Sequence, residues 1–359
     1  MQLVLVARHL GLAAMVRVQG PGSMKVMSDL SFELNAELLP ANKIQNMSIC
    51  LSISVNLCSS PHLQPKLKFF SWRGAGLAWN SLGRWIHFPN QSWVLSYEKN
   101  LNNFDSKKIQ HIEIWTESAA FAVEKSFLYT LAIFGIELEK RGYLRLHAAS
   151  FRSQERALAV FGPSGVGKTT LVDCLLNHSN CNVFSDEITL ICKEFQNQHF
   201  VAWPLRLAKK ISGSYAAASD ERLRADGRLR RLMPIPPDRV AERSGTADKV
   251  GMIFFGVHKK HSEARILPLT FLRSLLFVLQ VSFGWHLPQM FEISLRLSLV
   301  FHFAKEFFRR FAWAMKMLAM GRVQSLIIPI FSNDSEKDRA ALAHLLILLH
   351  HDFDRKARG

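Results

Sequence analysis

Alternation of apolar and polar residues dominates the first third of the chain and predicts β-structure there. The segment Leu51–Leu57 alternates most strictly, at the period of a half-buried strand. Weaker alternation predicts three more strands, at Ser31–Ala36, Trp93–Tyr97 and His111–Trp115. Clusters of Gly, Pro and Asn separate these runs, as expected for turns between strands.

The pattern then changes to a helix followed by a hairpin. Ser118 is expected to cap a helix that runs to about Arg141, with Gly142 as its C-terminal stop. Two strand-like runs follow, Tyr143–Phe151 and Arg156–Phe161, and a short polar turn joins them. Such a short link predicts an antiparallel hairpin, because a parallel pair needs a long crossover.

The patterns in the rest of the chain predict further strands and helices, so the fold class that we expect is mixed α/β. They predict a strand over Cys181–Ile191, basic loops over 203–265, helices over 270–320, a last strand over Gln324–Phe331 and an amphipathic helix over Asp334–Leu349. Pro329 places the last strand toward the edge of a sheet, since proline cannot donate to the ladder. We therefore divide the chain into a β-rich region over 1–117 and an α/β domain over 118–359 with a helical C-terminal part. Residues 1–23 show no clear pattern and are expected to be unstructured.

A complete G-x-x-x-x-G-K-[ST] motif runs from Gly162 to Thr169, between a predicted strand and a helix-like segment. Its glycines let successive backbone N–H groups point at a phosphate, and the helix N-terminus adds partial positive charge. Lys168 can reach the β- and γ-phosphates, and the Thr169 hydroxyl can ligate Mg²⁺. The motif thus predicts ATP and Mg²⁺ as ligands. The expected nucleotide-binding residues are Gly162, Pro163, Ser164, Gly165, Val166, Gly167, Lys168, Thr169 and Thr170.

An acidic pair, Asp186 and Glu187, follows the motif near a strand that is expected to neighbour the P-loop strand. A P-loop kinase needs a carboxylate to hold Mg²⁺ or to accept the proton of the attacking hydroxyl, and Asp186 can do either. We predict Thr169, Asp186 and Glu187 as metal ligands. The alternative is a solvated acidic pair at a strand bend.

His147 lies on the strand that is predicted to run antiparallel to the P-loop strand. From there it can face the phosphates and pair with the acidic residues, or it can be a packed or surface histidine. The predicted catalytic residues are Asp186, Lys168 and His147.

Three motifs in this order resemble a known family: Leu146-His147-Ala-Ala, Ala-Val-Phe-Gly162 through Lys168-Thr169, and Phe184-Ser-Asp186-Glu187. They are similar to the C-terminal domain of HPr kinase/phosphorylase, and closer still to the HPr-kinase-related P-loop proteins. The motifs cover residues 143–192. The resemblance implies a P-loop kinase core with a mixed sheet, similar in fold to phosphoenolpyruvate carboxykinase.

The same resemblance implies an ATP-dependent kinase that transfers the γ-phosphoryl group to a hydroxyl, serine foremost. By family analogy Asp186 supplies the base, with Glu187 and His147 in support, and family members often form homo-oligomers. Glu187 stands where HPr kinases have Asp, and their later Arg-Gly-x-Gly signature is absent, so the acceptor stays open between a protein and a small molecule. A second reading is a catalytically silent, ATP-binding regulatory protein.

Composition indicates a folded protein, and the net charge indicates which kinds of partner the protein can bind. With 48% hydrophobic and 21% charged residues the chain can bury a core. The net charge of +16 suits phosphate ligands, acidic partners, nucleic acid or an anionic membrane, or else a solvated basic surface. Charge alone suggests a third reading, a nucleic-acid-associated NTPase, but no recognition motif supports a nucleic-acid partner. Basic residues that can clamp phosphate or dock an acidic partner are Arg206, Lys209, Lys210, Arg228, Arg230 and Arg231.

Cysteine usage and hydropathy bear on the compartment. Five scattered cysteines do not form a disulfide framework, so we expect reduced thiols and a cytoplasmic protein. The apolar run Phe127–Ile136 is too short to span a bilayer, and Arg273 interrupts the later run Ile266–Val281. We therefore expect no transmembrane span.

Overall fold

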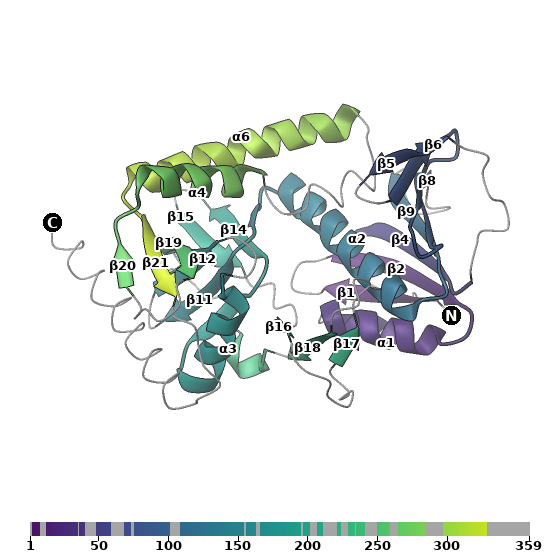
Figure 1. Cartoon of the computed structure of the whole chain (residues 1–359), viewed down its shortest axis with the longest axis horizontal. Coiled ribbons are helices and arrows are strands. Elements are labelled where there is room, and N and C mark those ends of the chain that lie inside the picture. The colour runs from purple at the N-terminus through teal and green to yellow at the C-terminus, as the bar shows by residue number, and fades with distance from the viewer. Residues whose placement is uncertain are drawn as a thin grey trace. The chain divides into compact units, whose positions relative to one another are not determined.

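The chain divides into two compact units in a computed structural model (Figure 1). Unit 1 comprises Met1–Arg141, Lys210–Leu232 and His286–Phe301, and unit 2 comprises Gly142–Lys209, Met233–Trp285 and His302–Gly359. The structure describes residues 2–7, 12–34, 36–39, 48–58, 68–72, 75–100, 108–153, 156–162, 166–194, 197–201, 207–210, 221–223, 229–233, 235–240, 250–258, 265–283 and 297–328.

Unit 1 is built on a mixed nine-stranded sheet in the order β3-β1-β2-β4-β9-β8-β7-β6-β5. β2, β4 and β9 run parallel to one another, and the remaining pairs are antiparallel. The strands are β1 (Gln2–Ala7), β2 (Leu12–Gln19), β3 (Glu37–Leu39), β4 (Ser48–Asn56), β5 (Phe70–Trp72), β6 (Ala75–Trp79), β7 (Arg84–His87), β8 (Trp93–Asn100) and β9 (Lys108–Trp115). The strands expected at Leu51–Leu57, Trp93–Tyr97 and His111–Trp115 are confirmed as β4, β8 and β9.

Two expectations for the N-terminal part are wrong. Residues 1–23 include β1 and β2, whose apolar side chains are buried in the sheet. The strand expected at Ser31–Ala36 is the end of α1 (Ser23–Leu34). Its buried residues Val26, Leu30 and Leu34 recur at helical spacing, and this period outweighs the short alternation at its end.

The helix expected after Ser118 is α2 (Ala119–Lys140). The Ser118 hydroxyl accepts a hydrogen bond from the Phe121 N–H at 3.2 Å, and Gly142 follows the helix with a φ of +92°. α2 packs on α1 and on β4 and β9. The structure therefore places the division between units after Arg141, not after residue 117, because the helix buries its apolar side chains in unit 1.

α2 is also long and apolar enough to cross a membrane by length and composition. Among the described residues it alone meets this test, and most of its residues are buried inside the protein. The sequence reading predicted this helix at nearly its full length, but it judged only the run Phe127–Ile136 as a possible membrane span. A core helix of a folded unit passes the same test, because it too is apolar around most of its circumference.

Unit 2 is built on a mixed six-stranded sheet in the order β13-β11-β12-β19-β21-β20. The strands are β11 (Ala149–Ser153), β12 (Arg156–Phe161), β13 (Asn182–Ser185), β19 (Val250–His258), β20 (Arg265–Leu267) and β21 (Val323–Ile328). β11 and β12 form the expected antiparallel hairpin. β19 runs parallel to β12, and β21 runs parallel to β19.

Two strands of this sheet correct the sequence reading. β19 lies within the segment expected to be loops, yet it pairs with both β12 and β21. β21 is not an edge strand, because β19 and β20 flank it. β21 covers Val323–Ile328 of the expected strand, and Pro329 lies outside the described residues.

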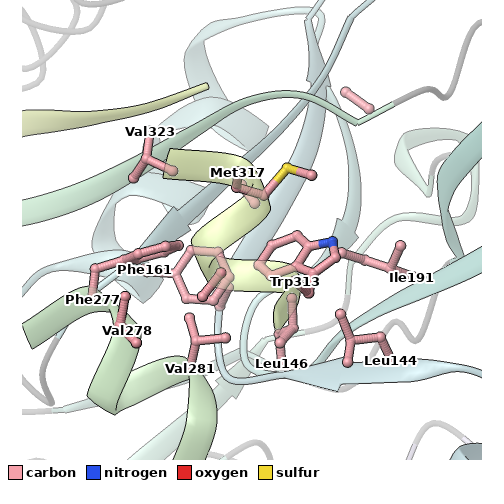
Figure 2. Close-up of a cluster of buried hydrophobic side chains, with 14 of the residues drawn as sticks. Leu144, Leu146, Phe161, Ile191, Phe277, Val278, Val281, Trp313, Met317 and Val323 are labelled. Atoms are coloured by element: carbon pink, nitrogen blue, oxygen red, sulfur yellow. The ribbon is translucent and has the colours of Figure 1, made fainter. Parts of the chain in front are cut away.

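Helices pack on both faces of the six-stranded sheet. Ala157, Ala159 and Phe161 of β12 belong to a core with α4 (Phe271–Phe283) and α6 (Leu297–Ala319), where Phe161 lies beside Phe277 and Trp313 (Figure 2). The alternate residues Leu158 and Val160 pack with α3 (Lys168–His178). This alternation is that of a strand buried on both sides, and the unit is a layered, mixed α/β structure.

A second, three-stranded sheet in the order β10-β14-β15 joins unit 2. Its strands are β10 (Leu144–Leu146), β14 (Thr189–Glu194) and β15 (Asn197–Val201). The runs expected over Tyr143–Phe151 and Cys181–Ile191 are therefore each split between two sheets. The shorter elements are β16 (Leu207–Lys210), β17 (Glu221–Leu223), β18 (Leu229–Met233) and η3 (Pro237–Arg239), and the helix expected at Asp334–Leu349 lies outside the described residues.

Arg239 closes the C-terminal end of α3. Its guanidinium donates hydrogen bonds to the backbone carbonyls of Leu175, Leu176, Ser179 and Cys181. The last carbonyls of a helix have no partner within the helix, and a cation there also complements the helix dipole. One side chain thus satisfies the end of the helix that follows the glycine loop.

We expect Arg239→Met to lower the free energy of unfolding by about 2–4 kcal/mol, because several charge-assisted hydrogen bonds are lost together. Chemical denaturation of the whole chain, followed by circular dichroism, measures this change. Arg17→Met, at an exposed arginine of β2, is the control and should shift the midpoint little. Equal stability of the Arg239 and Arg17 variants would contradict the capping role.

Candidate nucleotide site

The glycine loop, Gly162–Thr169, connects β12 to α3 in unit 2. Pro163, Ser164 and Gly165 lie outside the described residues. Gly167 is the N-cap residue of α3 with a φ of +94°, a left-handed conformation that favours glycine. The first N–H groups of a helix have no partner within the helix. The beginning of α3, which includes Lys168, Thr169 and Thr170, therefore presents donors and partial positive charge to an anion.

Lys168 is buried at the first turn of α3, with 8% of its surface exposed. Its Nζ donates a hydrogen bond to the carbonyl of Gly162 at 2.9 Å. Burial lowers the pKa of Lys168, and the nearby charges of Asp186 and Glu187 act in the opposite direction. The ammonium is therefore held in a desolvated place between the loop backbone and the acidic pair.

Thr169 and Asp186 are brought together, as the sequence predicted for two metal ligands. The Thr169 hydroxyl donates a hydrogen bond to Asp186 Oδ2 at 2.9 Å. The other carboxylate oxygen, Asp186 Oδ1, is buried and has no hydrogen-bond partner among the described residues. A buried carboxylate oxygen without a partner is costly unless a ligand or ion completes the site.

The electrostatics of Asp186 reflect this burial. Desolvation raises the pKa of Asp186 from 3.8 to about 7. The hydrogen bond from Thr169 and the charge of Lys168 oppose the rise, while the charges of Glu187 and Asp173 add to it. Asp186 therefore changes its protonation state close to neutral pH.

Two adjacent strand bends position the acidic pair and His147. β13 ends at Ser185 and β14 begins at Thr189, opposite the point where β10 ends at Leu146 and β11 begins at Ala149. Asp186 and Glu187 lie in the first bend and His147 in the second. The Ser185 hydroxyl accepts from the N–H of Ile188 at 3.0 Å, and the Thr189 hydroxyl donates to the Ala148 carbonyl at 2.8 Å, which ties the two bends together.

This arrangement corrects one part of the sequence reading. β13 pairs with β11, so β11 separates the strand before the acidic pair from β12, the strand before the glycine loop. Asp186 still reaches Thr169, because the chain leaves the sheet at the bend and turns toward the start of α3.

His147 contacts the acidic bend through the backbone. Its Nδ1 lies 3.1 Å from the carbonyl oxygen of Glu187, and since a carbonyl only accepts, Nδ1 carries the proton. Burial lowers the pKa of His147 to about 4, and the charge of Lys168 adds to this effect. The histidine is thus neutral at pH 7. The expectation that it lies on a strand is wrong, because it lies in a bend, and its hydrogen bond to the acidic pair is to the main-chain oxygen of Glu187.

Gln280 of α4 is a site residue that the sequence reading missed. Its Nε2 donates to the Gly162 carbonyl at 2.6 Å, so this oxygen accepts from both Gln280 and Lys168. Gln280 is half-buried, and it is the amide side chain in an otherwise mainly apolar helix. A polar residue at that position was the available signal, but 118 positions of sequence separate it from Gly162.

Of the three residues that are expected to hold Mg²⁺, two provide oxygen atoms that suit a hard cation. The described residues contain no group of three or more His, Cys, Asp or Glu side chains suited to a metal. In phosphoryl-transfer sites, however, Mg²⁺ is typically held by one or two protein oxygens together with phosphates and water. The Thr169 hydroxyl and the unpaired Asp186 Oδ1 provide oxygens of that kind. Glu187 is close enough to raise the pKa of Asp186, and its role as a ligand stays a prediction.

Comparisons with known proteins give a limited result. No family model matches the chain, and no curated protein matches it. The solved structure of the HPr(Ser) kinase/phosphatase from Coxiella burnetii matches with 12% sequence identity and a TM-score of 0.28. That match covers 60% of this chain and 99% of the other. At so low a TM-score the likeness decides neither fold nor function, and the family resemblance stays a prediction.

Other predicted basic residues gain no support at this site. Arg206 and Arg228 lie outside the described residues. Lys209 and Lys210 belong to β16, and Arg230 and Arg231 belong to β18. Their roles as phosphate clamps or docking residues stay predictions.

Proposed function

We propose that this protein is an ATP-dependent kinase that transfers a γ-phosphoryl group to a hydroxyl acceptor. The hydrogen bond between Thr169 and Asp186 at the start of α3 carries the proposal, because it joins the two residue types that such a site needs. The complete glycine-loop motif and its resemblance to HPr-kinase-related proteins support it further.

The chain's own groups account for nucleotide binding in this proposal. The N–H groups at the beginning of α3 donate hydrogen bonds to phosphate oxygens. Lys168 moves from the Gly162 carbonyl to the β- and γ-phosphates. Gln280 remains on that carbonyl, so the loop backbone does not lose all its hydrogen bonds when Lys168 leaves. Bound through Thr169 and Asp186, Mg²⁺ would neutralise charge on the transferred group.

Asp186 is the candidate for the base that accepts the proton of the attacking hydroxyl. In the absence of a bound cation its pKa is raised to about 7, near the operating pH at which a general base works best. His147 is neutral and donates to the Glu187 carbonyl, so we propose that it positions the acidic bend rather than transferring the proton. The acceptor class is a hydroxyl, serine foremost, on a protein or small molecule.

The proposed setting is the cytoplasm, because the five cysteines are too few and too scattered for a disulfide framework. We propose no nucleic-acid partner. A homo-oligomer stays a proposal that rests on the family resemblance.

Calorimetry of the whole chain with ATP and Mg²⁺, followed by transfer of labelled phosphate from ATP to proteins of a host lysate, tests the proposal. We expect saturable, Mg²⁺-dependent ATP binding and a labelled product. Binding without any turnover or transfer would identify the protein as the catalytically silent regulator instead. Failure to bind ATP would refute both.

Gln280→Leu provides a more specific test of the loop geometry. Lys168 still occupies the Gly162 carbonyl in the free protein, so we expect the free energy of unfolding to fall by no more than about 1 kcal/mol. When Lys168 moves to the phosphates, the carbonyl is left without a partner, and we expect ATP affinity to fall about tenfold. Calorimetry and denaturation measure the two quantities.

The matched control is Gln110→Leu in unit 1, where the amide donates to the Tyr97 carbonyl at 3.1 Å. This variant removes that hydrogen bond and a second one to the Ser96 hydroxyl at 2.7 Å, and it should leave ATP affinity unchanged. Equal ATP affinity of the Gln280 variant and wild type would show that Gln280 only fills space beside the loop.

A further inference from the structure

Exposed apolar side chains gather on α4 and α6 in unit 2. We call them the apolar face, defined by Phe271, Leu272, Leu275, Leu276, Leu279 and Phe283 of α4 and Phe308, Phe311 and Met315 of α6. Phe271 is 87% exposed and Phe308 67%. Large apolar groups in such number on one side of a protein mark an interaction surface.

The two helices form one surface. Their opposite sides share the core around Phe161 and Trp313, as Figure 2 shows, and the rings of Phe283 and Phe307 lie 5.1 Å apart. α4 and α6 accordingly run beside each other over the same face of the six-stranded sheet (Figure 1).

The charges on these helices are of one sign where they face outward. α4 has no acidic residue, and Glu306, the acidic residue of α6, is buried. Arg273 donates to Ser325 at 2.7 Å and so turns toward β21. Lys305, three residues before Phe308, and Lys316, next to Met315, are exposed. The apolar face is therefore accompanied by cations and by no exposed carboxylate from either helix.

We propose that the apolar face binds an anionic lipid surface and lies in its headgroup region. Phenylalanine and leucine on one side, with lysines beside them, are the composition of helices that lie in a membrane interface. Fluid lipid accepts side chains as exposed as Phe271 without a matching groove, which a protein partner would have to provide. The lysines complement anionic headgroups, and the 13 residues of α4 are too few to span a bilayer. This proposal does not depend on the kinase proposal.

Co-sedimentation of the whole chain with vesicles tests it. Vesicles of phosphatidylcholine alone are compared with vesicles containing equal parts of phosphatidylcholine and phosphatidylglycerol. We expect strong binding of the wild-type protein to the anionic vesicles, and we expect this binding to weaken with added salt.

Combining Phe271→Gln and Phe308→Gln should lower the partition coefficient by about tenfold or more, because apolar area that enters the lipid is lost. Combining Lys305→Glu and Lys316→Glu should lower it by about fivefold per lysine on anionic vesicles only.

Matched controls carry the same substitutions elsewhere. Phe70→Gln alters a phenylalanine of unit 1 that is 61% exposed, and the pair Lys25→Glu and Lys68→Glu repeats the change of net charge at exposed lysines. Both controls should bind like wild type. Circular dichroism verifies that every variant is folded.

Three outcomes would overturn the proposal. One is the absence of binding to anionic vesicles. Another is equal loss in the controls and the face variants, which would assign binding to overall charge. The third is a dimer by light scattering that the Phe271 and Phe308 substitutions dissociate without any lipid binding, which would make a second copy the occupant.

Discussion

Replacing Lys168 by alanine will abolish phosphate transfer while the fold survives. In the proposed kinase, Lys168 would supply the positive charge beside the phosphates, from a buried position where charge acts strongly. We expect the rate of transfer to fall by about 10²–10³-fold or more, the scale found for removing one fixed donor from a reaction centre. The Gly162 carbonyl keeps its hydrogen bond from Gln280, so the loop retains an anchor in the variant. Labelled-phosphate transfer and calorimetry with ATP and Mg²⁺ measure the effect.

Lys25→Ala is the control, because it removes an exposed lysine from α1 in the other unit. It should leave both ATP affinity and transfer unchanged. Undiminished ATP binding by a folded Lys168→Ala variant would exclude the glycine loop as the nucleotide site, whatever activity the protein has.

Replacing Asp186 by asparagine should separate stability from function. The asparagine carbonyl can still accept the hydrogen bond from Thr169, so the local geometry is preserved. The variant has no carboxylate to bind a cation or accept a proton. We therefore expect Mg²⁺-dependent transfer to fall by about 10²-fold or more, on the scale of general acid–base catalysis.

The same variant should be more stable than wild type above neutral pH. The pKa of Asp186 in the folded protein is raised to about 7 from 3.8, so the folded state holds the proton more tightly than the unfolded state. The stabilising contribution of the protonated carboxyl is complete below about pH 4, declines as the pH rises and is lost above about pH 7. At pH 8, Asp186→Asn should raise the free energy of unfolding by up to about 4 kcal/mol, and at pH 4 the two proteins should differ little. Denaturation at both pH values measures the difference.

Asp173→Asn is the matched control on α3, where Asn177 donates to Asp173 Oδ1 at 3.0 Å. This buried carboxylate accepts a hydrogen bond from Asn177 of its own helix and is not a proposed ligand or base, so Mg²⁺-dependent transfer should persist. If Asp186→Asn lowers stability at pH 8, the carboxylate is ionised and well solvated in the folded protein, and the proposed buried ligand is refuted.

Local patterns predicted the elements whose signals lie within a few residues. Ser118 and Gly142 mark the ends of α2 in the structure as they do in the sequence, because caps depend on adjacent backbone groups. The hairpin of β11 and β12 followed from the length of its turn. The meeting of Thr169 and Asp186 was expected from their motifs, and the structure places them 2.9 Å apart.

The predicted secondary structure was wrong where one local pattern of apolar residues is compatible with two structures. The end of α1 alternates like a strand over a few residues, and only its burial against the sheet and α2 selects the helix. The segments around His147 and Asp186 each read as one strand, because a bend between two buried strands does not interrupt apolar periodicity.

The sequence by itself determined the glycine loop, its flanking strand and helix, and the residue types of the candidate site, since all of these depend on neighbours along the chain. Only the tertiary structure decided that β11 lies between β13 and β12, and that Gln280 reaches Gly162. It also decided that one buried oxygen of Asp186 has no hydrogen-bond partner among the described residues. Contacts between residues far apart in the chain depend on strand order and on how helices pack. Neither leaves a periodic signal in the segments concerned.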